Sequence, residues 1–240
     1  MALTENISGH LRKVLQSTSI KPVSRNEYVK HLRSSMIATD NLGLLNDAVE
    51  PVLSRTALDG FEHIVISEHA LLGPVSEMLT KRTMFPKAKR RVQNIDRAFS
   101  DRSLNLHLAI APQAECWAAL LADDDFSPAR SDNSAPVHSW ANLVSRITAA
   151  CPRAQVTVWN FEQPEKVVLP FLSALLGIDG DRLDRKTRTA TTQHACQQLK
   201  NAKLLSKIIQ LDEDLQTRMD VQYELDLTTL AAMPKVTLIE

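Results

Sequence analysis

The chain has 240 residues, 44% of them hydrophobic, which suits one large domain with a sizeable core. Lysine plus arginine and aspartate plus glutamate number 28 each, so no net field draws the protein toward nucleic acid or a membrane surface. The N-terminal residues lack the features of a signal peptide, and no apolar run approaches the roughly 20 residues of a membrane span. Three widely spaced cysteines favour neither disulfides nor a zinc site. We therefore expect a cytoplasmic protein with no membrane span and no metal.

Helices are expected to dominate, because glycine is scarce. One helix is predicted near residues 7–16, and the capping box of Ser24 and Glu27 begins a second. The later predicted elements, in order, are a strand at 63–66, a basic helix after Pro86, a strand at 104–110, a helix opened by Pro112, a mobile loop near 123–137, a helix at 138–149, a strand at 156–159, a helix at 165–176 ended by Gly177, and a long helix near 191–218. Alternating strands and helices are typical of a parallel sheet with crossover helices. The expected fold is α/β, helix-rich, in a single domain over 1–240.

Three segments resemble bacterial sulfotransferases of the kind that modify polysaccharides. Residues 66–73 are similar to that family's strand ending in Ser-Glu-Glu-Asn-Leu-Leu-Gly, and residues 84–91 to its Leu-Tyr-Pro-x-Ala-x-x-Arg. The strand at 108–110, Trp140 and residues 158–162 are similar to its strand, later tryptophan and Val-Trp-x-Tyr-Glu. The segments occur in the family's order and together span about residues 62 to 176.

The resemblance implies a sulfotransferase fold, a parallel sheet flanked by helices and related to P-loop nucleotide binders. It implies a transferase that takes sulfate from 3′-phosphoadenosine 5′-phosphosulfate. The family holds the 5′ end of this donor on a Lys-Thr-Gly-Thr-Thr-like loop between the first strand and the first helix. Backbone N–H groups at a helix N-terminus and a nearby lysine neutralise the charge of such a group.

Two features of this chain depart from the family pattern. Residues 1–8, before the first predicted helix, contain neither an apolar strand nor a lysine. Ala111 and Ala119 stand where the family has an arginine and a serine that grip the 3′-phosphate, and alanine can neither donate a side-chain hydrogen bond nor carry charge. Each lost charge-assisted bond costs about 1.5–3 kcal/mol. Either the true start lies upstream or the chain is a degenerate relative, and the interior alanines favour degeneration.

Three functions follow as expectations. The leading one is a sulfotransferase-like pseudoenzyme, degenerate in donor binding, that acts as a non-catalytic binding or accessory protein in surface-polysaccharide metabolism. The alternative is an active sulfotransferase that moves sulfate from the donor nucleotide to a glycan hydroxyl. The third is a protein-interaction module that uses its C-terminal helix near 191–218, where Leu204 and Ile208 lie on one side together with Leu211.

Two residues are candidates for the catalytic base of the active alternative. Glu68 follows a strand at the edge where open α/β sheets bind ligands, and it is placed to deprotonate an acceptor hydroxyl. His69 is a second candidate because the pKa of histidine lies near neutrality. The structural alternative is that Ser67 and Glu68 cap or brace the next segment and that His69 is a surface residue.

Two basic clusters are candidates for anion binding. Lys87, Lys89, Arg90 and Arg91 form a patch for an anionic glycan or a nucleotide phosphate, with a solvated helix face as the structural alternative. The run that contains Arg185, Lys186 and Arg188 resembles the Arg-Lys-Gly segment with which some sulfotransferases hold the 3′-phosphate, but Thr187 replaces the glycine, and a charged surface turn is the favoured structural alternative.

The aromatic and acidic residues near the predicted strands favour structural roles. Trp117, Trp140 and Trp159 each fall in a predicted element and are expected to be buried. Glu162, just past a strand, is expected either to orient a neighbouring basic group or to brace the structure. Asp123, Asp124 and Asp125 are expected to form a solvated helix end, because consecutive carboxylates rarely converge on one cation.

Overall fold

A three-stranded parallel sheet lies at the centre of the described part of the protein. Its strands are β3 (Asn105–Ile110), β4 (Gln155–Asn160) and β5 (Val236–Ile239), in the order β3–β4–β5. All six residues of β3 pair with β4, and β4 pairs in turn with β5. A second parallel pair consists of β1 (Ile20–Pro22) and β2 (His63–Val65). The predicted α/β class with a parallel sheet is therefore confirmed.

The computed structural model describes residues 20–22, 63–66, 71–73, 77–78, 83–121, 137–177, 189, 193, 197 and 212–240. The predictions for the two N-terminal helices, for residues 67–69, for nearly all of the loop near 123–137 and for residues 185–188 lie outside these ranges. Within them, no helix combines the length and the apolar character that crossing a bilayer requires.

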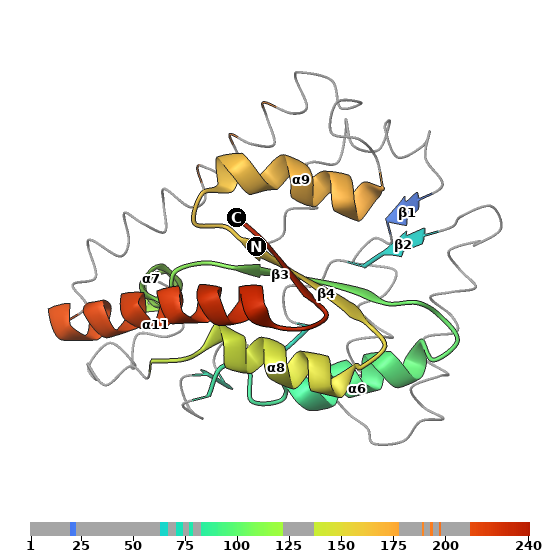
Figure 1. The fold of residues 1–240 in the computed structure, drawn as a ribbon, viewed down its shortest axis with the longest axis horizontal. Coiled ribbons are helices and arrows are strands. Elements are labelled where there is room, and N and C mark those ends of the chain that lie inside the picture. The colour runs from blue at the N-terminus through green and yellow to red at the C-terminus, as the bar shows by residue number, and fades with distance from the viewer. Residues whose placement is uncertain are drawn as a thin grey trace.

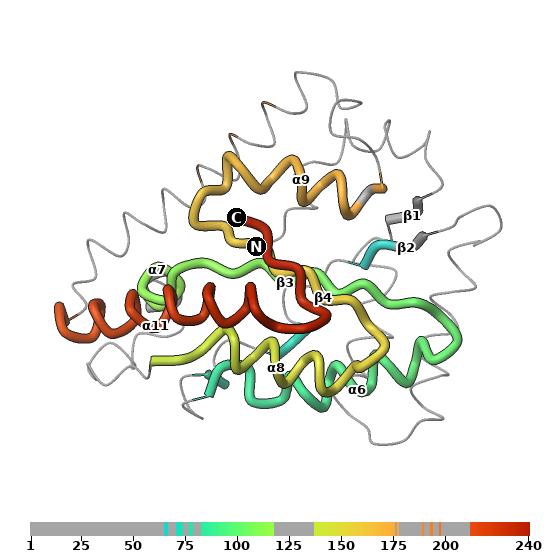
Figure 2. Tube along the Cα trace, in the orientation of Figure 1, coloured from blue at the N-terminus to red at the C-terminus, as the bar shows by residue number. Residues whose placement is uncertain are grey.

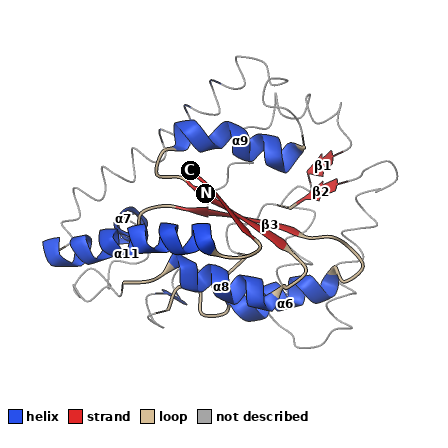
Figure 3. Cartoon of the chain, in the orientation of Figure 1, coloured by secondary structure: helices blue, strands red, loops and turns tan. Residues whose placement is uncertain are grey.

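Helices cover both faces of the central sheet. α9 (Pro164–Leu176) lies on one face, and α6 (Ala88–Ala98), α8 (Trp140–Ala150) and α11 (Glu213–Ala232) lie on the other (Figure 1). α7 (Gln113–Leu121) follows β3 directly. The trace in Figure 2 shows helical segments between successive strands of the sheet, and Figure 3 shows the strands enclosed by helices. This arrangement is the one that crossover connections between parallel strands produce.

The alternation of side chains along the strands builds two cores. Leu106, Leu108, Val156 and Val158 belong to the main core, which also includes residues of α6, α8 and α11. Trp159 points to the opposite face and packs with residues of α9 in a smaller cluster. Successive strand residues face opposite sides, so one strand serves both cores.

The boundaries of most predicted elements are confirmed to within a few residues. Strands occur at 63–65, 105–110 and 155–160, and helices follow Pro86 and Pro112 as expected. The Ser139 hydroxyl accepts a hydrogen bond from the Asn142 N–H and caps α8. Gly177 ends α9 with φ of 55°, the left-handed conformation that favours glycine. The three tryptophans are buried, with 2%, 6% and 3% of Trp117, Trp140 and Trp159 exposed.

The prediction of one long helix over 191–218 is wrong at its C-terminal end. Residues 189, 193 and 197 are helical, but Asp212 is not, and its carboxylate accepts from the backbone N–H groups of Asp214 at 3.0 Å and Leu215 at 3.2 Å. Asp212 therefore begins a new helix, α11, which continues to Ala232 and leads into the strand β5, which was not predicted.

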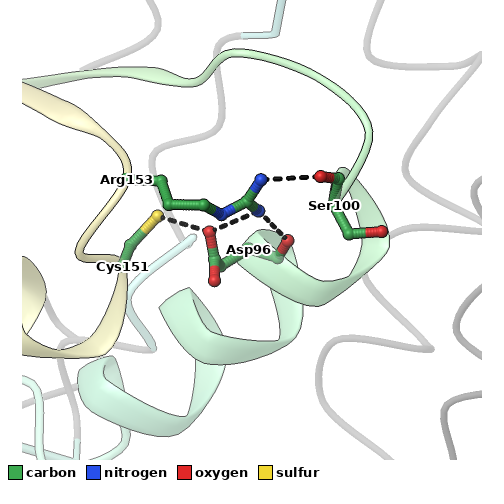
Figure 4. A network of polar contacts seen from close by, with 4 residues as sticks. All are labelled: Asp96, Ser100, Cys151 and Arg153. Atoms are coloured by element: carbon green, nitrogen blue, oxygen red, sulfur yellow. Dashed lines mark hydrogen bonds and ion pairs between the residues drawn. The ribbon is translucent and has the colours of Figure 1, made fainter.

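A polar network ties the end of α6 to the turn before β4. The Arg153 guanidinium donates to the Asp96 carboxylate at 2.8 Å, to the Asp96 carbonyl at 3.0 Å and to the Ser100 carbonyl at 2.6 Å (Figure 4). The Cys151 thiol lies 3.1 Å from the same Asp96 oxygen and is fully buried. The network lies at the start of β4, away from the end of the sheet where ligands are expected, so its role is structural.

Cys151 is expected to resist alkylation in the folded protein. Burial, and then its hydrogen bond to Asp96, raises the pKa of this thiol to about 11, and the thiolate is the reactive form. At pH 8, mass spectrometry after iodoacetamide treatment should find Cys151 unmodified in native protein and modified in urea. Equal labelling rates in the two conditions would contradict the packing described for this residue.

Candidate functional site

The ends of β3, β4 and β5 form one edge of the sheet, which we call the carboxyl edge. In open α/β proteins, ligands bind at this edge. Here β3 is followed by Ala111 and Pro112 before α7 begins, β4 is followed by Phe161 and Glu162, and β5 by Glu240. The sequence resemblance implies that the donor nucleotide would bind at this edge. The charges and hydrogen-bond donors found there therefore bear on whether the protein binds the donor.

A buried hydrogen-bonded group connects β4 to α11 at the carboxyl edge. The Tyr223 hydroxyl donates to Asn160 Oδ1 at 2.6 Å, and the backbone N–H of Glu162 donates to the same oxygen at 2.9 Å. Tyr223 and Asn160 are 3% and 6% exposed. Burial first, and then nearby negative charge led by Glu162, raises the pKa of Tyr223 far above its ordinary value. Tyr223 therefore stays protonated and acts as a fixed donor.

Asp226 of α11 occupies the N-terminus of α8. Its carboxylate accepts from the Ser139 hydroxyl at 2.6 Å, from the Trp140 backbone N–H at 2.7 Å and from the Gln222 side-chain amide at 3.0 Å. The residue is 1% exposed. A helix N-terminus attracts anions through its free N–H groups and its dipole. At the N-terminus of α8, the carboxylate of Asp226 already occupies the position that a bound anion would take.

Gln113 and His138 hold the start of α7 against the segment before α8. The Gln113 side chain donates to the His138 carbonyl, and its oxygen accepts from the His138 backbone N–H at 2.9 Å. The Trp140 indole N–H donates to the Ala111 carbonyl at 3.0 Å. The His138 ring stacks on Trp117 with 5.7 Å between ring centroids, and its buried Nε2 has no hydrogen-bond partner among the described residues.

The buried imidazole of His138 predicts a loss of stability in mild acid. Burial, and then the charge of Arg146, lowers the pKa of His138 below its ordinary value of about 6.5. Between that value and the lowered one, the unfolded chain binds more protons than the folded chain, so the free energy of unfolding falls as pH falls from about 6.5. Urea unfolding at pH 7.5, 6.5 and 5.5 measures this slope, which is at most about 1.4 kcal/mol per pH unit for one histidine.

Substitution isolates the contribution of this residue. His138→Gln should flatten the slope between pH 6.5 and 5.5, since glutamine does not titrate. Burial also lowers the pKa of His107, which is part of another cluster, so His107→Gln serves as the matched comparison and should remove its own share of the slope. An unchanged pH dependence in the His138 variant would show that this imidazole is accessible to protons in the folded state.

His107 and Trp159 form a pair on the α9 face of the sheet that spacing rules did not indicate. The Trp159 indole N–H donates to His107 Nδ1 at 3.1 Å, and the two rings stack with 6.0 Å between centroids. Phe171 of α9 meets both rings edge-on. Because Nδ1 accepts, the neutral imidazole carries its proton on Nε2. The pair is an aromatic core contact with one polar bond.

The four basic residues predicted as an anion patch differ in exposure and in their partners. Lys87 pairs with Glu77 at 2.6 Å, so its charge is offset. Arg91 is only 4% exposed, and its guanidinium donates to the Leu71 carbonyl at 3.3 Å. Lys89 and Arg90 are exposed on α6. Three of the four predicted patch residues are therefore exposed, and one of these three, Lys87, is paired with an acidic side chain.

The other predicted site residues have separate outcomes. Glu68, His69, Arg185, Lys186 and Arg188 lie outside the described residues. Glu162 lies at the carboxyl edge as expected, and its backbone braces Asn160, while its carboxylate forms no ion pair within the ranges that are described. Those ranges also contain no group of three metal-ligating side chains.

The first charged residue after each strand of the sheet is a carboxylate, and the nearest cation that follows a strand in sequence is Lys166, in the first turn of α9. The five residues after β3 include Glu115, the five after β4 include Glu162 and Glu165, and Glu240 follows β5, with no lysine or arginine among them. Like charges 4 Å apart repel by about 1–4 kcal/mol, depending on their exposure to solvent. The carboxyl edge, as far as it is described, is thus poorly suited to a phosphate or sulfate.

Comparison with known proteins adds no relative. No family model, no curated protein and no solved structure matches the chain at a significant level. Within its described residues, the chain has a three-stranded parallel sheet with helices on both faces. Its activity must be argued from the carboxyl edge and from the sequence motifs.

Proposed function

We propose that this chain is a sulfotransferase-like protein that has lost donor binding and acts as a non-catalytic binding or accessory protein, in surface-polysaccharide metabolism. Two observations support a sulfotransferase ancestry. The motif segments occur in the family's order, and the strands and helices that contain them alternate around a parallel sheet. The polysaccharide context comes from the resemblance and is the part of the proposal that depends on it alone.

The charge of the carboxyl edge carries the proposal. A donor with phosphates at both ends needs positive side chains and free backbone N–H groups. At the end of β3 the chain has Ala111, whose side chain has neither a charge nor a hydrogen-bond donor. The N-terminus of α8 is filled by Asp226, and Glu162 adds a negative charge at the end of β4. Each of these features disfavours an anionic nucleotide.

An active sulfotransferase is the alternative function. It would use Glu68 or His69 as the base and Arg185, Lys186 and Arg188 to hold the 3′-phosphate of 3′-phosphoadenosine 5′-phosphosulfate, with a glycan hydroxyl as acceptor. The resemblance is what favours it. Among the described residues that follow the strands, Lys166 in the first turn of α9 is the cation nearest to a strand end, so most of the donor's charge would have to be met by other parts of the chain.

A thermal-shift titration distinguishes the two functions. Adenosine 3′,5′-bisphosphate represents the donor without its transferable group, and a ligand at 100 times its dissociation constant stabilises the folded state by about 2.7 kcal/mol. The proposal predicts no change in melting temperature up to about 1 mM nucleotide, whereas a donor-binding enzyme with a micromolar Kd should melt several degrees higher. A saturable rise would reject the non-catalytic proposal.

A further inference from the structure

α11 presents an apolar stripe on its exposed face. Val221 and Leu225 are 64% and 58% exposed, and they are the large hydrophobic residues that stand out as exposed in the described part of the chain. Four residues apart on a helix, they are neighbours. They lie on the opposite side of α11 from Met219, Tyr223 and Leu230, which are buried in the protein.

Threonines extend this stripe along the helix. The hydroxyl groups of Thr217, Thr228 and Thr229 each donate to the carbonyl four residues earlier, at 2.8, 3.1 and 2.7 Å. Their donors are thus used inside the helix, and these side chains offer a partner chiefly methyl groups. Together with Val221 and Leu225, these threonines form a surface about three helical turns long that is suited to apolar contact.

One flank of the stripe is acidic. Glu213, Asp220 and Glu224 are exposed and lie on the same side of α11, because their spacings of seven and four residues return to one side of a helix. None of them forms an ion pair within the part of the chain that is described. Asp214 and Arg218 lie within the stripe at its N-terminal end, where their charges offset each other at 3.1 Å.

We infer that this surface, the α11 stripe, binds an amphipathic helix of a partner protein that carries lysine or arginine along one edge. Apolar side chains at spacings of three and four residues form a ridge that packs into the groove of another helix. The acidic flank selects a basic edge in that helix and disfavours a second copy of α11, which would bring like charges together. The inference does not depend on donor binding, and it places a partner on α11 rather than on the leucines and isoleucine predicted at 204–211.

A designed peptide tests the stripe in the full chain. The probe is a fluorescein-labelled amphipathic helix of about 18 residues, with leucines at spacings of three and four and lysines along one edge. The comparison peptide has glutamates in place of the lysines. Fluorescence anisotropy should show saturable binding of the lysine peptide and at least about tenfold weaker binding of the glutamate peptide.

Matched variants locate the binding surface. Leu225→Gln removes apolar contact, and Glu224→Lys reverses one charge of the acidic flank. Each substitution should raise the Kd of the lysine peptide by about tenfold. Asp101→Lys makes the same charge change at a carboxylate that is 76% exposed outside α11, and it should leave binding unchanged. Because the substituted side chains are exposed, urea unfolding should show all three variants folded with wild-type midpoints.

Other outcomes overturn the inference. Three results would show that α11 does not bind a basic amphipathic helix selectively. These are absence of binding, equal affinity for the two peptides, and equal effects of Glu224→Lys and Asp101→Lys on the affinity for the lysine peptide. A concentration-dependent dimer in sedimentation experiments that Leu225→Gln abolishes would assign the stripe to a second copy of the chain instead.

Discussion

Replacing Asp226 by alanine is expected to lower the free energy of unfolding by about 3 kcal/mol. The carboxylate is buried and accepts from the hydroxyl of Ser139, the backbone N–H of Trp140 and the amide of Gln222. Alanine leaves these donors without their acceptor, and the Trp140 N–H is in the core where water does not replace it. The cap of α8 and the contact between α8 and α11 are lost together.

Urea unfolding at pH 7.5 measures this effect. Asp226→Asn keeps an acceptor of the same shape without its charge, so about half of the loss is expected. Asp220→Ala is the matched control, because it removes a carboxylate from the exposed side of the same helix, and it should change the free energy of unfolding by less than about 0.5 kcal/mol. Equal losses at the two positions would show that Asp226 does not cap α8.

Leu230→Ala is expected to destabilise the protein by about 3 kcal/mol, within the 2–5 kcal/mol typical of buried leucines. Leu230 is fully buried and belongs to the main core with Val156 and Val158 of β4. Truncation removes apolar contact and leaves a cavity between α11 and the sheet, which the surrounding backbone can close only in part.

The same helix supplies the control for this prediction. Leu225→Ala makes an identical change at a side chain that is 58% exposed, and it should alter the free energy of unfolding by less than about 0.5 kcal/mol. Urea unfolding of the wild type and of both variants, fitted with one common m-value, gives the change in the free energy of unfolding for each substitution. If the two substitutions cost the same, the face of α11 that packs on the sheet would be misassigned, and so would the α11 stripe.

The central strands and helices could be predicted because their apolar residues recur at regular spacing and because residues that end an element follow them. The strand around Val156 alternates, α9 has apolar residues at helical spacing, and Gly177 ends it. α11 was mispredicted because the apolar spacing of residues 204–215 continues through Leu215 and Met219. The available signal was Asp212 followed by two acidic residues, which is the pattern of a capped helix start.

The candidate site was harder to predict than the fold. Strand ends could be found, so Glu162 and Ala111 were predicted from sequence to follow directly after strands. The polar contacts there could not, because Tyr223 lies 63 residues from Asn160 and Asp226 lies 87 residues from Ser139. No periodicity links residues that far apart, and the pairing depends on where α11 packs.

The charge of the carboxyl edge decides between a non-catalytic protein and a donor-binding enzyme, and isothermal titration calorimetry with adenosine 3′,5′-bisphosphate tests it most directly. Thermal shift reports stabilisation, whereas the calorimeter reports binding itself and its stoichiometry. With acidic side chains after the strands and Ala111 at the end of β3, we expect no saturable heat up to about 1 mM nucleotide. A one-to-one isotherm with a Kd of about 10 µM or tighter would contradict the account and identify a working donor site.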